Sequence, residues 1–125
     1  IHAGWRGLCG SIVENGVSCF SDASEVIAWL GPAIGPNAFE VGRDVYEAFL
    51  LKSIQFQSAF TEKSSNNKDD KWLADIHLLA TISLQMSGVQ LIYASPHCTY
   101  SESGRFFSYR REGETGRMAT AIWMV

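Results

Sequence analysis

Hydrophobic residues recur every three or four positions along three segments of the chain, and this spacing predicts three amphipathic helices. We expect these helices over 9–20, 39–51 and 72–86. The third segment has the strongest pattern, and a glycine follows it as a stop signal. Gly4 and Gly7 are expected to form the turn that leads into the first helix.

Short apolar runs bounded by turn residues predict strands. Residues 26–30, stopped by a Gly-Pro pair, and residues 89–94 are both expected to be buried strands. Two further strands, 105–111 and 118–125, are predicted as an antiparallel pair joined by a turn at 112–116. The alternation of helices and strands predicts an α+β (mixed α/β) fold in which helices flank a mixed sheet.

The composition limits the class of protein. The chain has 125 residues, enough for one domain, and a net charge of −3. It lacks the basic stripe that nucleic acid or an anionic membrane would require, so neither is an expected partner. No apolar run approaches the ~20 residues that cross a bilayer, which indicates a soluble protein. Residues 62–71 contain no apolar side chain and are expected to form an exposed loop.

The cysteines and the first residues bear on the cellular setting. Three cysteines, an odd number, occur in a chain with enough aromatic residues to form a core without disulfides. Reduced thiols in the cytoplasm are therefore expected. The first residues carry no signal-peptide pattern. A polar, glycine-rich motif begins at the first residue instead, which suggests that the chain starts inside a larger protein.

The motif at residues 1–7 contains two side chains that could carry chemistry. His2 is expected at the end of a strand, beside a glycine turn, where α/β proteins place ligands. It could be a metal ligand or a hydrogen-bonded structural residue. Arg6 could bind a phosphate or carboxylate through its forked guanidinium, or it could be a surface cation beside a core Trp5.

A complete zinc site would need three or four ligands from the histidines and cysteines, which are His2, His77, His97, Cys9, Cys19 and Cys98. No Cys-x-x-Cys or His-x-x-x-His pair occurs, so no complete structural zinc site is expected. His97 and Cys98 could be a base and a nucleophile, although neighbouring residues on an extended chain point to opposite sides. A free thiol is the favoured interpretation of Cys98.

Aromatic and cationic residues share the predicted strand 105–111. Alternation would place Phe107, Tyr109 and Arg111 on one face and Arg110 on the other. One arginine could then face a ligand site, or the segment could be an ordinary amphipathic hairpin.

Several longer blocks, taken together, resemble the C-terminal half of the YfiH or laccase-domain family. They occur in the family's order and cover nearly the whole chain, at residues 1–7, 30–36, 39–42, 73–75, 98–99, 106–111 and 115–119. The resemblance implies that residues 1–125 are the C-terminal part of a single YfiH-like domain whose N-terminal half is not in this sequence.

The same resemblance implies a metal-dependent enzyme that acts on purine nucleosides. The expected reaction is phosphorolysis of adenosine, inosine and methylthioadenosine to the free base and ribose 1-phosphate, with adenosine deamination alongside. Other names used in the family imply a laccase-like copper polyphenol oxidase or a peptidoglycan-editing factor. The 3 histidines are few for the several coppers of a laccase.

The family's metal, zinc or copper, is held by two histidines and one cysteine. His2 matches one of these histidines, which makes it the expected metal ligand and catalytic residue, whereas the other two ligands lie upstream of this sequence. Catalysis by this chain alone is therefore expected to be impaired, and an inactive truncated product is the remaining alternative.

Local chemistry adds candidates for the substrate. Arg6 is the first candidate for phosphate or a substrate oxygen, Arg110 or Arg111 is the second, and Phe107 and Tyr109 could stack on a purine base. A purine nucleoside and phosphate are thus the expected ligands. Missing strands would leave sheet edges and apolar surface open, so self-association is also expected.

Overall fold

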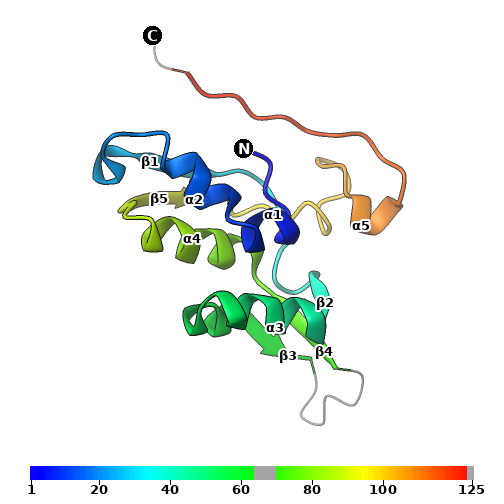
Figure 1. The fold of residues 1–125 in the computed structure, drawn as a ribbon. Coiled ribbons are helices and arrows are strands. Elements are labelled where there is room, and N and C mark those ends of the chain that lie inside the picture. Colours follow the sequence, from blue (N-terminus) through cyan, green and yellow to red (C-terminus); the bar gives the residue numbers. More distant parts are fainter. Residues whose placement is uncertain (64–69, 124–125) are drawn as a thin grey trace.

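The computed structural model describes residues 1–63 and 70–123, which contain five α-helices, two 3₁₀ helices and five strands (Figure 1). The helices are α1 (Trp5–Cys9), α2 (Ile12–Val17), α3 (Arg43–Lys52), α4 (Ile76–Met86) and α5 (Tyr109–Glu112), with 3₁₀ helices at Ala23–Glu25 and Ile54–Ala59. The strands are β1 (Ile27–Leu30), β2 (Glu40–Gly42), β3 (Phe60–Glu62), β4 (Lys71–Ala74) and β5 (Leu91–Ala94). None of the described helices has the length and apolar character needed to cross a membrane.

The strands form two small sheets. β1 and β5 pair in parallel, with Ile27 opposite Leu91 and Leu30 opposite Ala94. β4 lies between β2 and β3 and is antiparallel to both. The mixed α and β class is therefore confirmed, and the parallel and antiparallel pairs lie in separate sheets.

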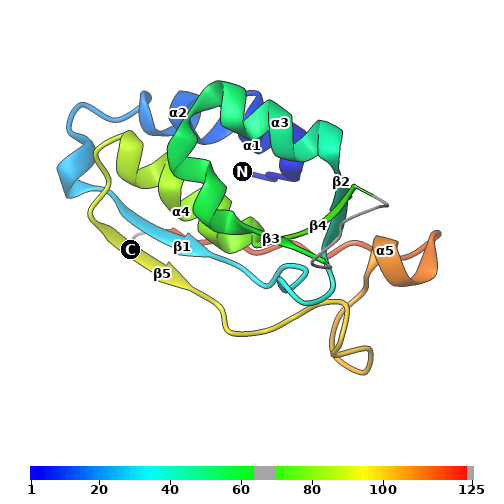
Figure 2. The ribbon, with the colours of Figure 1, turned by 90° about the horizontal axis from the view of Figure 1, so that it is seen from below.

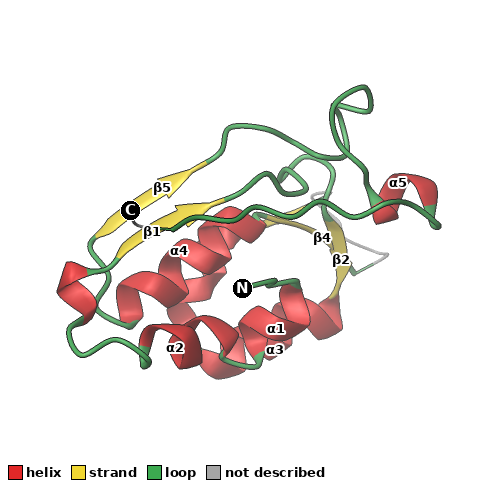
Figure 3. Cartoon of the chain, turned by 90° about the horizontal axis from the view of Figure 1, so that it is seen from above, coloured by secondary structure: helices red, strands yellow, loops and turns green. Residues whose placement is uncertain are grey.

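The hydrophobic core lies between the helices and both sheets. Figure 3 shows β1 and β5 along one side of α4, while α1, α2 and α3 lie along its other side. Figure 2 shows the antiparallel sheet closing the end of this layered arrangement beside α3 and α4. Four core residues with no exposed surface are Leu8 of α1, Phe49 of α3, Phe56 of the second 3₁₀ helix and Leu79 of α4. The helices α1 to α4 thus each bury apolar residues, whereas α5 has no buried residue.

The boundaries of the helices differ from those that the hydrophobic spacing predicts. The predicted helix 72–86 begins only at Ile76, because Lys71–Ala74 hydrogen-bond as the central strand of the antiparallel sheet. Asp75 separates the two elements, and its Oδ1 accepts a hydrogen bond from the N–H of Leu78 at 3.0 Å. This side-chain cap starts the helix at the point where strand pairing ends.

The other two helix predictions differ in a similar way. The predicted helix 39–51 begins at Arg43, because Glu40–Gly42 pair with β4 as β2. Of the predicted helix 9–20, only Ile12–Val17 form a helix of their own, α2, because a separate helix, α1, begins earlier and includes Gly7, which was expected in the turn. Ser11 between α1 and α2 has the left-handed φ of 65°. A non-glycine residue in this conformation cannot continue a right-handed helix, so the chain turns there.

The predicted hairpin near the C-terminus is wrong. Tyr109–Glu112 form α5, and residues 113–123 contain no strand. The carbonyl of Ser108 accepts hydrogen bonds from the N–H groups of Arg111 and Glu112, which closes a helical turn where a strand was expected. The expected strand residues 124–125 lie outside the described part of the chain.

Strands 26–30 and 89–94 are confirmed as β1 and β5, each slightly shorter than expected. The expectation that both strands are buried is wrong, because no residue of β1 or β5 is fully buried: Ala28, Leu30 and Ile92 are half-buried and the others are exposed. Of the expected loop 62–71, the two ends belong to β3 and β4, and 64–69 lie outside the described residues.

Candidate functional site

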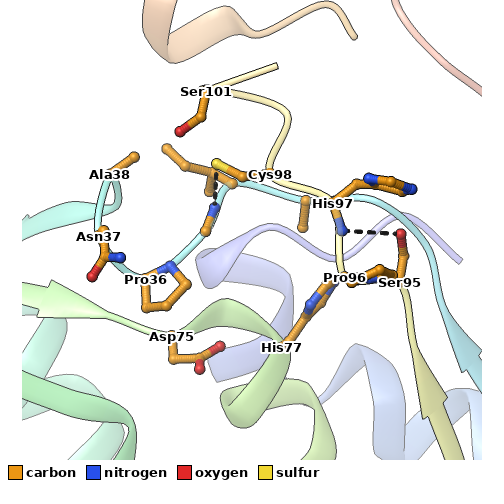
Figure 4. A pocket seen from close by; sticks show the side chains of 13 residues that line it. Pro36, Asn37, Ala38, Asp75, His77, Ser95, Pro96, His97, Cys98 and Ser101 are labelled. Atoms are coloured by element: carbon orange, nitrogen blue, oxygen red, sulfur yellow. Dashed lines mark hydrogen bonds between the residues drawn. The ribbon is translucent and has the colours of Figure 1, made fainter. Parts of the chain in front are cut away.

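The main candidate site is a cavity of about 260 Å³ at the C-terminal ends of the parallel strands (Figure 4). The loop after β1 and the loop after β5 form two of its walls, and the start of α4 forms a third. The polar side chains that line it are Asn37, Asp75, His77, Ser95, His97, Cys98 and Ser101. Parallel strands in α/β proteins place ligands at this end of the sheet, so the cavity is in the expected position for a binding site.

The two loops are tied together by backbone pairing that continues beyond the strands. The N–H of Ser95 donates to the carbonyl of Leu30 at 2.8 Å, and the N–H of Thr99 donates to that of Ala33 at 2.9 Å. Ala33 and Cys98 form an isolated parallel bridge between these two bonds. The cavity therefore has a rigid base, built as an extension of the β1–β5 pair.

Cys98 adds a side-chain bond between the same loops. Its Sγ accepts a hydrogen bond from the N–H of Gly35 at 3.1 Å. Partial burial raises the pKa of the Cys98 thiol, but hydrogen bonds from Ser101 and from the backbone of Gly35 and Tyr100 outweigh it and hold the pKa below its ordinary value. The sulfur is thus an acceptor with enhanced thiolate character at the wall of the cavity.

Glu102 organises the same loop from behind. Its Oε1 lies 3.2 Å from Nδ1 of His97 and accepts from the N–H of Cys98 at 3.0 Å, while its Oε2 accepts from Arg105 at 3.1 Å. Partial burial raises the pKa of Glu102, but these hydrogen bonds and the nearby cationic groups lower it below the ordinary glutamate value. His97 thus contacts Glu102 rather than forming a base and nucleophile pair with Cys98.

His77 and Asp75 have structural partners of their own. Nε2 of His77 donates to the carbonyl of Gly31 at 2.8 Å, which ties the start of α4 to the loop after β1. Asp75 caps α4 through Oδ1. Both side chains still line the cavity, so they supply it with polar atoms.

The N-terminal motif gives one half-buried and two exposed side chains. Trp5 is partly buried and packs against the core, whereas His2 and Arg6 are exposed. The Arg6 guanidinium stacks over the Trp5 ring at 4.5 Å from its centroid. Among the described residues Arg6 has no hydrogen-bond or ion-pair partner, so its donors can bind an anion.

The predicted substrate residues near the C-terminus have different roles in the fold. Phe107 and Tyr109 are exposed. Arg110 donates to the carbonyl of Glu40 at 2.8 Å. Arg111 donates to three backbone carbonyls, those of Thr99 at 2.7 Å, Tyr100 at 2.6 Å and Phe106 at 2.8 Å. Arg111 therefore stabilises the loop over residues 99–106, which follows Cys98 at the wall of the cavity.

The structure does not bring all the predicted site residues together. Within the described residues, no hydrogen bond or ion pair joins His2 or Arg6 to α5, and the two groups belong to separate elements (Figure 1). The sequence does not reveal that Asp75 and Cys98 line one cavity, or that Glu102 supports its wall from behind. The partners of Glu102, which are His97, Cys98 and Arg105, are close to it in the sequence, whereas Gly35 and Cys98 are 63 positions apart and no local pattern joins them.

The described residues do not by themselves fit the family's metal. Within them, no group of three or more histidine, cysteine, aspartate or glutamate side chains could hold a metal ion. His2 is exposed at the start of the chain and belongs to no such group of three within the described residues.

These features define an α/β chain with a polar, ligand-sized cavity at the C-terminal ends of its parallel strands. The family model described as multi-copper polyphenol oxidoreductase laccase matches residues 1–125, so the chain belongs to this family. The resemblance to the YfiH or laccase-domain family is thereby confirmed.

Relatives and solved structures agree with this assignment. An Escherichia coli K12 protein named purine nucleoside phosphorylase YfiH is 51% identical over 125 residues, which are 99% of this chain and 49% of the relative. A Haemophilus influenzae purine nucleoside phosphorylase is 46% identical over 98% of this chain and 50% of the relative. A crystal structure of a Neisseria meningitidis protein of the DUF152 family has a TM-score of 0.83 and 43% identity, covering 90% of this chain and 45% of that one. The chain thus spans about half the length of these proteins.

Proposed function

We propose that this chain is part of a purine nucleoside phosphorylase. In this reaction phosphate attacks C1′ of the ribose, the bond from C1′ to the purine nitrogen breaks, and ribose 1-phosphate and the free base leave. The observation that carries the proposal is the 51% identity, over 99% of the chain, to an Escherichia coli protein named for this activity. Adenosine, inosine and methylthioadenosine are the proposed substrates, with deamination of adenosine as an accompanying activity.

The proposed anion site is Arg6. Its side chain is exposed and has no partner within the described residues, so the guanidinium keeps its paired donors for phosphate oxygens. Arg110 is the second candidate, although one donor is already bound to the carbonyl of Glu40. Phe107 and Tyr109 are proposed to stack on the base, because both rings are exposed. Arg111 is proposed to position the loop beside them through its three carbonyl bonds.

We also propose that His2 supplies one ligand to a zinc ion, with copper as the alternative, and that the remaining ligands come from outside this chain. Support comes from the laccase description of the family and from the match of the motif at residues 1–7 to the family's histidine. The three free cysteines support a reducing setting such as the cytoplasm.

A phosphate-dependence assay tests the proposed reaction. The assay uses this chain alone and a full-length chimera in which the N-terminal half of the Escherichia coli relative precedes it. We expect the chimera to release hypoxanthine from inosine only when phosphate is present. Release without phosphate would indicate a hydrolase instead, and no release from either protein would support the inactive alternative.

Two arginine variants of the chimera test the anion site. Arg6→Ala is expected to raise the KM for phosphate by roughly tenfold, the effect of losing one charged hydrogen bond. Arg43→Ala is the matched control, because Arg43 is an exposed arginine already paired with Glu47 and Asp70. An unchanged KM for phosphate in the Arg6→Ala variant would show that Arg6 does not bind phosphate.

Oxidation of phenols by a copper enzyme is the second candidate function, because the family model is described as a polyphenol oxidoreductase laccase. Oxygen uptake with a phenol, measured on the copper-loaded chimera, distinguishes it from phosphorolysis.

Self-association of the isolated chain is a separate proposal. It is supported by large exposed apolar side chains and is tested by sedimentation.

A further inference from the structure

Lys52, the last residue of α3, places its ammonium group where three helices meet. Its Nζ donates to the carbonyl of Leu8 in α1 at 2.8 Å and lies 2.6 Å from Oε1 of Glu14 in α2. It also lies 5.9 Å from the centroid of the Phe56 ring. The side chain is only 17% exposed, although lysine is normally among the most exposed residues. Lys52 thus connects α1 and α2 to α3, on the side of α4 where all three helices lie (Figure 3).

The helix α1 is too short to be stable without contacts from the rest of the fold. It contains five residues and α2 contains six, well below the length at which a helix forms alone. Neither the N-cap residue Gly4 nor the N-cap residue Ser11 makes a side-chain capping bond. The last carbonyl groups of a helix lack partners within it, and a cation beside them is favourable. Lys52 supplies this cation from α3.

The pair of Lys52 and Glu14 is better suited to fixing the geometry than to adding stability. When a charged pair is taken out of water, desolvation offsets most of its attraction, so apolar side chains in its place are often equally stable. Oε2 of Glu14 is buried and has no hydrogen-bond partner among the described residues. The carboxylate therefore depends on Lys52, and the pair favours the one arrangement of the three helices in which the two charges meet.

Arg6 lies on the helix that Lys52 stabilises. It is two residues before Leu8, and its carbonyl accepts a hydrogen bond from the N–H of Gly10 at 2.8 Å. A shift of the Leu8 carbonyl therefore moves the backbone of Arg6 as well. We propose that Lys52 is a positioning residue, which fixes α1 so that the Arg6 guanidinium is held ready to bind phosphate. This inference rests on the proposed role of Arg6.

Phosphate binding by the full-length chimera tests the proposal. The dissociation constant for inorganic phosphate is measured by calorimetry for the unchanged chimera, for Arg6→Ala, for Lys52→Met and for a double variant with Lys52→Met and Glu14→Leu. We expect Arg6→Ala to bind roughly tenfold more weakly. Both variants that contain Lys52→Met should bind at least about threefold more weakly, because an Arg6 that is no longer held in place has to be ordered by the ligand.

The double variant separates position from stability. It leaves no buried charge unpaired, so its resistance to urea should return toward that of the unchanged chimera while phosphate binding stays weak. Lys52→Arg keeps a cation beside the Leu8 carbonyl and should bind phosphate within about twofold of the unchanged chimera. Phe49→Leu is the matched control for a general loss of stability, because Phe49 is a fully buried residue of the same helix. It should leave phosphate binding within the same limit.

Amide hydrogen exchange reports on α1 without any ligand. The N–H groups of Leu8 and Gly10 donate to the carbonyls of Gly4 and Arg6 within this helix. In Lys52→Met they should exchange at least about tenfold faster, because the helix opens more often. The N–H of Leu79 in α4 is the internal control, and its rate should not change. Unchanged exchange at Leu8 and Gly10 would overturn the proposal.

The binding results distinguish this inference from the proposed function. If Arg6→Ala binds phosphate weakly and Lys52→Met binds it normally, Lys52 has no positioning role and Arg6 keeps its own. Recovery of tight binding in the double variant would show that Lys52 acts on stability alone. Normal binding by Arg6→Ala, or no binding by the unchanged chimera, would overturn both the role of Arg6 and that of Lys52. Calorimetry needs no turnover, so a chimera that binds phosphate through Arg6 without cleaving inosine would contradict only the proposed reaction.

Discussion

Replacement of Arg111 tests whether a predicted substrate residue acts instead as a structural tether. Its guanidinium donates to the carbonyls of Thr99, Tyr100 and Phe106, and its side chain is 20% exposed. A hydrogen bond to a charged group contributes roughly 1.5–3 kcal/mol when buried. Because water can replace part of each bond at this exposure, we take about 1 kcal/mol for each and expect Arg111→Ala to lower the free energy of unfolding by about 3 kcal/mol.

That loss is large beside the total stability of about 5–15 kcal/mol that is usual for a domain. It corresponds to a fall in Tm of roughly 10 °C for a chain of this length. The assay is urea unfolding followed by far-UV circular dichroism. The m value, which is the slope of the unfolding free energy against urea concentration, should be unchanged. Arg111→Lys should lose most of the same stability, because a single ammonium group cannot reach three carbonyls in different directions.

Arg110→Ala is the matched control, because the neighbouring Arg110 is exposed and makes one bond to the backbone carbonyl of Glu40. We expect it to cost less than about 1 kcal/mol. Equal losses for the two alanine variants would refute the tether. In the chimera, an Arg111→Ala variant that stays stable but binds phosphate weakly would indicate that Arg111 binds the substrate rather than stabilising the loop.

Three further predictions concern the core, the cap and the loop. Phe49→Ala, which removes a fully buried ring from contact with Phe56 and Phe60, should lower the free energy of unfolding by about 3–5 kcal/mol in urea, well beyond Phe49→Leu. Asp75→Ala should cost about 1 kcal/mol of unfolding free energy by removing the cap of α4, and Asp75→Asn should cost less because its amide oxygen still accepts from Leu78. Because the folded-state pKa of Glu102 is lowered, its stabilising contribution is present above the ordinary glutamate pKa and is lost as the pH falls through the lowered value. Urea titrations across that acidic range should show a shallower loss of stability in Glu102→Gln.

Local patterns were enough for the class of fold but not for the element boundaries. The run from Trp72 to Ala74 continues the apolar spacing of α4, so periodicity alone extends the helix backward. Strand pairing with β2 and β3 decides otherwise, and no local pattern reveals that pairing. Asp75 marks the start of α4 in the sequence, because aspartate is a preferred residue at the N-cap of a helix.

The roles of His2 and Arg6 remain predictions from one short segment. Arg6 is exposed and has no hydrogen-bond or ion-pair partner within the described residues, which leaves its guanidinium accessible to a ligand. The cavity was not predicted, because its bond between Gly35 and Cys98 joins residues 63 positions apart. Arg111 was assigned to a strand face, and its tethering role follows from a helical turn that alternation could not predict.

The close approach of Gly35 to Cys98 couples the identities of these two positions. A Cβ at position 35 would lie 3.1 Å from Sγ and 3.2 Å from Cβ of Cys98, so an added methyl group there requires Cys98 to shift by a few tenths of an ångström. Substitutions at the two positions should therefore be non-additive, and Gly35→Ala should be better tolerated when residue 98 is smaller. Paired changes at 35 and 98 then offer a way to adjust the width of the cavity, and with it the size of ligand that the loops admit.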